Sequence, residues 1–311
     1  MVRRRAFVWK SAVSALVSGC ARETVEQPAP RPAGSGVVTV GGADLSVVFD
    51  GEPPNLPRAR YEQWVGTSAQ MITDYYGGTL PVPDLEIAIV PRGRGGVGFG
   101  SHRRGRWIRV YVGRQTSSRS LERDWVMVHE MLHATFPDLT DEHRWMQEGL
   151  STYLEKVVRV RAGNLTEAEV WERLSASMHH GRPRAGDRGL ARTRTWGRTY
   201  WGGALFWMMA DIELREQTDN RASLDTALLH IASMGANARQ MWEPAQVCEA
   251  CDHGTGTSTL SQLYDRMAMA PGDVDLDRLW QELGVIRHDD DSVSFDDGAP
   301  MAATRRGIAN G

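Results

Sequence analysis

Alternating apolar and polar residues predict several strands in the first third of the chain. The runs VVTV at 37–40 and LSVVFD at 45–50 are joined by two glycines, a pattern typical of two short strands and a tight turn. DLEIAIVP at 84–91 and WIRVYVG at 107–113 alternate as half-buried strands do. We therefore expect a sheet built from these segments.

Helical patterns separate two of these strands and dominate from about residue 121 onward. Between Pro57 and Tyr76, large apolar and aromatic residues recur every three or four positions, and two glycines follow. The whole pattern predicts an α+β fold, with a small mixed α/β part at 37–118 and a mainly helical part at 119–311.

The first twenty residues have the layout of a bacterial secretory signal. Three arginines at 3–5 form a basic head, an apolar stretch follows, and LVSGC resembles a lipobox that ends at Cys20. Residues 21–36 are rich in Pro, Ala, Gly and charge, and we expect a disordered linker. These features predict a signal peptide over 1–20, lipidation of Cys20, and a lipoprotein of the bacterial cell envelope that faces the periplasm or the cell surface.

Bulk composition narrows the classes of function. The 311 residues carry a formal net charge of -3, which gives no reason to expect nucleic acid or an anionic membrane as the main partner. No apolar run is long enough to span a bilayer, so we expect contact with a membrane only through the N-terminal lipid anchor. We expect a monomer with one folded domain at 37–311.

The segment HEMLH combines residues that can form a metal site. On a helix, His129 and His133 lie on one face about one turn apart, and two neutral imidazoles there can bind one Zn²⁺. Glu130 lies beside them and can serve as the general base for a zinc-activated water. The surrounding residues are apolar almost all round, so this helix is expected to be buried. Ionisable residues are costly in such a helix unless a metal compensates them.

A second helix can supply the third ligand. Glu148 opens a further apolar-periodic segment, after a connection that contains a proline and several polar residues. A carboxylate from an adjacent helix would complete a three-ligand zinc site and leave one position for water.

HEMLH followed by WMQEGLSTYLE resembles the gluzincin metallopeptidases of the peptidase MA-like group, in the style of the aminopeptidase N and glycyl aminopeptidase families. The resemblance covers residues 124–214. It implies a thermolysin-like zincin core with an edge strand over the cleft. It also implies one zinc ion held by His129, His133 and Glu148, with Glu130 as base.

The segment RTYWGGAL is similar to a downstream segment of the same families, and this similarity implies that the hydroxyl of Tyr200 stabilises the oxyanion. An aromatic residue at the start of a buried helix is the alternative reading. The chain lacks the G-x-M-E-N segment that grips a free amino terminus, and it has no aspartate four residues after Glu148. The resemblance therefore does not extend to aminopeptidase specificity.

A stretch rich in glycine and arginine, residues 91–106, precedes WIRVYV. One interpretation is a flexible loop at the rim of the cleft, leading into WIRVYV as an edge strand that pairs with an extended peptide. A solvated hairpin is the other interpretation, and we favour it slightly.

Cys248 and Cys251 form a CxxC pair. In an exported protein a disulfide between them is the expected state. A second metal site with His253 and a redox motif are the alternatives.

Together these patterns predict an exported zinc metallopeptidase that acts on a peptide or protein substrate. The alternative from another class is an inactive envelope lipoprotein that keeps the fold for binding or scaffolding. A redox or metal-carrier protein centred on the CxxC pair is a third possibility.

Overall fold

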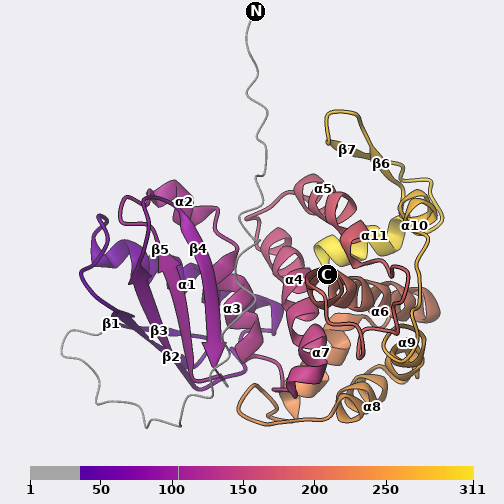
Figure 1. The fold of residues 1–311 in the computed structure, drawn as a ribbon, viewed down its shortest axis with the longest axis horizontal. Helices are drawn as coiled ribbons and strands as arrows, with labels where there is room; N and C mark the ends of the chain where they lie inside the picture. Colours follow the sequence, from indigo (N-terminus) through magenta and orange to yellow (C-terminus); the bar gives the residue numbers. More distant parts are fainter. Residues whose placement is uncertain (1–35, 104) are drawn as a thin grey trace, which may run out of the picture. The chain divides into compact units, whose positions relative to one another are not determined.

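A five-stranded mixed sheet forms the first part of the protein (Figure 1). The computed structural model describes residues 36–103 and 105–311. Strands β2, β3 and β5 run parallel to one another, while β1 and β4 are antiparallel to their neighbours. The spatial order is β1-β2-β3-β5-β4, with bounds β1 (Gly36–Val40), β2 (Ala43–Phe49), β3 (Asp84–Pro91), β4 (Val97–Arg103) and β5 (Trp107–Val112).

Alternation along the strands gives the sheet one buried face. Leu45 pairs with Leu85 and Ile87 pairs with Ile108, and all four side chains belong to the core. Helix α1 (Arg58–Tyr75) connects β2 to β3 and buries its aromatic stripe, including Tyr61 and Trp64, in the same core. Burial of this apolar face is the main force that fixes the register of the strands.

The prediction that WIRVYV forms the edge strand is wrong. This segment is β5, and β4 from the glycine-rich stretch covers it in the sheet of the described residues. The two strands form a hairpin, as the alternative interpretation holds, but β4 also contacts helix α3. The apolar residues of β5 fit this interior position, because Ile108, Val110 and Val112 are fully buried.

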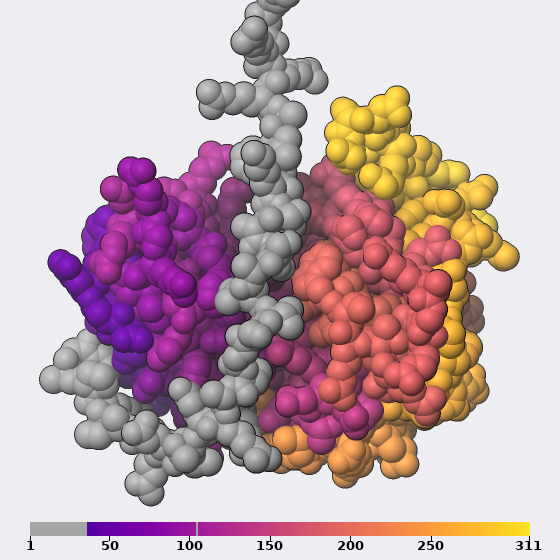
Figure 2. Space-filling model, viewed as in Figure 1, coloured from indigo at the N-terminus to yellow at the C-terminus, as the bar shows by residue number. Residues whose placement is uncertain are grey.

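Helices make up most of the second part, which Figure 2 shows in orange and yellow toward its C-terminal end. Helix α3 contacts β4 on one side and α4 on the other, and α4 packs on α6. The elements are α2 (Ser118–Glu122), α3 (Val126–Ala134), η1 (Asp141–His143), α4 (Arg144–Arg161), α5 (Glu167–Ser177), η2 (Met178–Gly181), the π-helical η3 (Gly197–Gly202), α6 (Gly203–Thr218), α7 (Leu224–Ser233), α8 (Pro244–Thr255), α9 (Thr259–Met267), α10 (Leu276–Leu283), β6 (Val285–Arg287), β7 (Val293–Phe295) and α11 (Ala302–Asn310).

The α+β prediction is confirmed, with the α/β part and the helical part in the expected order. The predicted signal peptide with Cys20 lies outside the described residues. So does the predicted linker, except for Gly36, which begins β1. Among the described helices, none combines the length and apolar character that crossing a membrane requires.

The expected disulfide is absent. Cys248 and Cys251 lie in α8 as free, buried thiols. Burial raises the pKa of the Cys248 thiol to about 12 and raises that of Cys251 well above its ordinary value. Both side chains therefore behave as small apolar core residues.

Candidate metal centre

Helix α3 carries the first motif in a buried position. All nine of its residues are buried, including His129, Glu130 and His133. Its first turn is capped by Asp124, whose carboxylate accepts hydrogen bonds from the backbone N–H groups of Val126 at 3.0 Å and Met127 at 2.9 Å. The cap begins the helix at the point that brings both histidines onto the face toward α4.

Helix α4 brings Glu148 to the same place. Residues 135–143 connect the two helices, and Gln147, in α4, holds this connection in place by donating to the Asp138 carboxylate at 3.1 Å. The two oxygens of Glu148 have separate roles. Oε1 accepts two hydrogen bonds from the Arg144 guanidinium, at 3.0 and 2.7 Å. Oε2 is directed at the histidines.

Three ligand atoms meet in an equilateral triangle. His129 Nε2, His133 Nε2 and Glu148 Oε2 are each 3.3 Å from the other two. Atoms at the corners of a tetrahedron centred on Zn²⁺, each about 2.0–2.1 Å from the ion, lie about 3.3 Å apart. The spacing of these three atoms therefore fits a zinc ion with a fourth position left open.

Packing orients the two imidazoles. Neither His129 Nδ1 nor His133 Nδ1 has a hydrogen-bond partner among the described residues. Instead, the Trp125 and His129 rings make a T-shaped contact at 5.5 Å between centroids. The His133 ring stacks on His102 at 3.9 Å and 18°. Ring contacts thus take the orienting role that a hydrogen-bonded partner usually has in a zinc site.

The charges in the cluster favour a cation. Burial acts to raise the pKa of Glu148, but its contacts with His133 and His129 outweigh burial and hold this pKa well below its ordinary value. Burial and the neighbouring His102 lower the pKa of His133 to about 4, which leaves its imidazole neutral at neutral pH. An ionised carboxylate and a neutral imidazole are the forms that bind zinc.

Glu130 lies next to the triangle and has a partner that the sequence did not suggest. His102, on β4, lies with its Nδ1 at 3.2 Å from Glu130 Oε2. Burial acts to raise the pKa of Glu130, but the His102 contact and the nearby imidazoles prevail and lower it. The carboxylate is thus ionised and can accept a proton. No motif marked His102, because it is a single histidine in a glycine- and arginine-rich stretch.

Tyr200 lies in η3, just before α6, and interacts with Glu148. Burial, the charge of Glu148 and a hydrogen bond to that carboxylate raise the pKa of Tyr200 to about 12. The hydroxyl is therefore a proton-bearing donor at neutral pH. The structure thus brings together every residue for which the sequence predicted a role in catalysis or metal binding, and adds His102.

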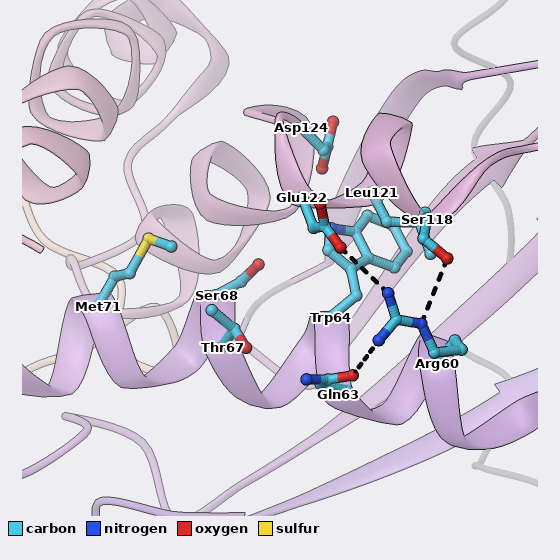
Figure 3. A pocket seen from close by; sticks show the side chains of 10 residues that line it. All are labelled: Arg60, Gln63, Trp64, Thr67, Ser68, Met71, Ser118, Leu121, Glu122 and Asp124. Atoms are coloured by element: carbon cyan, nitrogen blue, oxygen red, sulfur yellow. Dashed lines mark hydrogen bonds and ion pairs between the residues drawn. The ribbon is translucent and has the colours of Figure 1, made fainter. Parts of the chain in front are cut away.

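A small cavity lies away from this cluster, between α1 and α2. It has a volume of about 70 Å³, and Arg60 spans it by donating to Gln63, Ser118 and Glu122 (Figure 3). None of the three triangle residues lines it. Asp124, the cap of α3, is part of its wall.

Comparisons with known proteins extend this description. No family model matches the chain, and no curated protein matches it significantly. Among solved structures, an aminopeptidase N family protein from Idiomarina loihiensis is similar, with a TM-score of 0.62 and 17% identity, over 81% of this chain and 49% of that one.

The M1 zinc metallopeptidase from Deinococcus radiodurans is similar at a TM-score of 0.51 and 16% identity, over 77% of this chain and 52% of that one. A mutant of that M1 zinc metallopeptidase, bound to a Tyr-Ser-Ala substrate, gives a TM-score of 0.51 and 14% identity, over 77% and 52%. This chain thus spans about half the length of these structures. Likeness at such identity establishes a fold, and this chain shares its fold with the aminopeptidase N family protein and the M1 zinc metallopeptidase over the parts that match.

Proposed function

We propose that this protein is a zinc-dependent peptidase that hydrolyses peptide bonds. One observation carries the proposal: three ligand atoms lie 3.3 Å from one another, and an ionised Glu130 stands beside them. Such a set of donors fits one zinc ion with an open position, and a buried carboxylate next to it fits a general base. The similarity to M1 zinc metallopeptidases supports the same class of reaction.

Each residue has a defined part in the reaction. His129, His133 and Glu148 Oε2 would hold the zinc, which when bound supplies a Lewis acid that polarises the carbonyl and acidifies water. Glu130 accepts the proton of the attacking water and passes it to the leaving amine. Tyr200 donates a hydrogen bond to the developing oxyanion, because its raised pKa keeps its proton in place.

Arg144 supports the third ligand in this scheme. Its two hydrogen bonds occupy Oε1 of Glu148, which leaves Oε2 to bind a metal in one orientation. The arginine also offsets the negative charge of a carboxylate that is almost fully buried.

The first test is the metal content of the purified full chain. We expect about one zinc per chain, lost in His133→Ala and retained in Glu130→Gln, with His143→Ala as a control that keeps both metal and activity. Hydrolysis of a library of internally quenched peptides by the wild type, absent in Glu130→Gln, would support the peptidase. A zinc-loaded wild type that cleaves no peptide would instead favour the inactive binding protein.

Export and attachment to a membrane by lipid are a separate part of the proposal. They are supported by the signal layout of residues 1–20 and the cysteine at its end. Metabolic labelling with a fatty-acid analogue tests them: we expect the wild type to be labelled and Cys20→Ala to be unlabelled. Labelling of neither protein would refute the lipid anchor.

A further inference from the structure

We propose that His102 is a positioning residue that holds the Glu130 carboxylate in the orientation its work as base requires. This inference rests on the proposed function and goes beyond it, because no resemblance or motif assigns a role to this histidine. The observations behind it are a hydrogen bond, a ring contact and a close backbone approach, which all involve β4 and α3.

The hydrogen bond joins two elements that are distant in sequence. His102 Nδ1 lies 3.2 Å from Glu130 Oε2, and a carboxylate can only accept, so Nδ1 carries the proton. The Glu130 side chain is 9% exposed and that of His102 is 22% exposed, which leaves little water to compete for the bond. A terminal carboxylate otherwise rotates broadly about its last bond, so this contact selects one orientation.

The same imidazole also fixes the distance between the base and the metal ligands. Its ring stacks on His133 at 3.9 Å between centroids. One rigid side chain thus touches Glu130 through a nitrogen and His133 through a face. Displacement of the base by about 1 Å is enough to cost a reaction of this kind about 100-fold.

The strand can approach this closely because Gly100 has no side chain. A Cβ atom at Gly100 would lie 2.4 Å from Glu130 Cγ and 2.8 Å from its Oε1. Gly100 and His102 are two positions apart on β4, so both face α3. Gly100 and His102 together enclose the Glu130 side chain. The glycine faces Cγ of Glu130, and the imidazole contacts one of its carboxylate oxygens.

A second metal ion is the competing interpretation. His102, Glu130 and His133 have donor atoms within 4.8 Å of one another. The near-parallel stacking of the two rings directs their lone pairs side by side, however, whereas a shared ion requires lone pairs that converge. The positioning role is therefore the one that the geometry favours.

Kinetics of the zinc-loaded full chain test the role. The side-chain nitrogen of Asn can take the place of the histidine Nδ1, whereas the side-chain nitrogen of Gln takes the place of Nε2. We expect His102→Ala and His102→Gln to lower kcat by about 10- to 100-fold with KM nearly unchanged and one zinc retained. We expect His102→Asn to recover most of kcat, and the control His253→Asn, at an exposed position of α8, to match the wild type.

An imidazole NMR measurement tests the geometry without using activity. In a histidine-labelled full chain, we expect the His102 signals, identified by their loss in His102→Asn, to show the Nδ1–H tautomer. Replacing Glu130 by Gln should shift that proton, because the bond then has a neutral acceptor. A His102 ring protonated only at Nε2 would overturn the proposal.

The outcomes separate this inference from the proposed function. A wild type without peptidase activity would refute the function, while the NMR result would still decide the contact between His102 and Glu130. An active wild type with His102→Ala within about threefold of its kcat would overturn only the positioning role. Loss of zinc in His102→Ala, or a second zinc that this variant loses, would overturn it too, because the residue would then act on a metal.

Discussion

Gly100 is the residue whose smallness matters most for the proposed base. An alanine there would bring a methyl group to 2.4 Å from Glu130 Cγ, well inside contact distance. We predict that Gly100→Ala lowers kcat by about 10- to 100-fold while one zinc per chain remains, because the carboxylate must move and the metal ligands need not. Steady-state kinetics with a parallel metal analysis would measure both quantities.

Gly95 offers a matched control on the same segment. A Cβ atom there would meet its nearest neighbour, the Gln115 carbonyl oxygen, at an ordinary 3.8 Å. Gly95→Ala should therefore leave kcat within about twofold of the wild type. Equal losses in the two variants would show that the effect comes from stiffening the stretch before and within β4 rather than from Glu130.

At the scale of single residues, the sequence predicts the site residues that are regularly spaced along the chain. His129 and His133 are one helical turn apart, so their convergence follows from helix geometry alone. The second apolar-periodic helix and the resemblance both predict that Glu148 meets them, and the structure brings the three together. His102 could not be predicted, because its contact with Glu130 depends on how β4 packs against α3.

The cap of α3 connects the stability of that helix to pH. Burial, partly offset by backbone hydrogen bonds, raises the pKa of Asp124 from 3.8 to about 6. A raised pKa in the folded state means that folding favours the protonated form of Asp124. The contribution of Asp124 to the free energy of unfolding is therefore largest below about pH 4 and is lost as the pH rises through about 6. The lost contribution is about 2–3 kcal/mol.

We predict that the free energy of unfolding of the wild type, relative to that of Asp124→Asn, falls by about 2–3 kcal/mol between about pH 4 and pH 7. Urea unfolding of both proteins across this range measures the difference directly. Asp277→Asn, an exposed aspartate in the first turn of α10, serves as control and should show no such trend. A difference that stays constant with pH would contradict the prediction.

The contact between α4 and α6 depends on two glycines. A Cβ atom on Gly149 would lie 2.2 Å from the Gly203 carbonyl carbon, and backbone cannot move aside as a side chain can. We predict that Gly149→Ala lowers the free energy of unfolding by about 3 kcal/mol or more. Gly66→Ala in α1 is the control, because its nearest neighbour is a Val38 methyl at 3.1 Å and the change should stay within about 1 kcal/mol. Equal losses in urea unfolding would show that the α4–α6 contact is not special.

Elements with strong periodicity were predicted closely, and the others were not. The helix expected at 57–76 is Arg58–Tyr75, and the strand expected at 84–91 has those bounds. The sequence predicts a loop or hairpin where β4 lies, because glycines at alternate positions remove the apolar signal of its half-buried face. The π-helical turn at Gly197–Gly202 has no periodic signature, and it comes from packing in which the buried Arg198 donates to the Gly181 carbonyl.

On the scale of the whole molecule, the proposed metal would join the two parts of the protein. Two of its ligands lie on α3, which packs against β4 and β5, and the third lies on α4, which packs against α6. A ligand that binds only the folded chain stabilises it, by about 2.7 kcal/mol at a free concentration 100 times its dissociation constant. Zinc should therefore stabilise the protein as a unit as well as serve its chemistry.

We predict that removing metal with a chelator lowers the melting temperature of the full chain by about 5–10 °C, and that added zinc restores it. The melting temperature of His133→Ala should be close to that of the metal-free wild type. Neither the chelator nor added zinc should change it, because this variant lacks one of the three ligands. Glu130→Gln should respond as the wild type does, because the base is not a ligand. A chelator effect that persists in His133→Ala would locate the stabilising metal elsewhere, and the triangle of His129, His133 and Glu148 would lose its assignment as the zinc site.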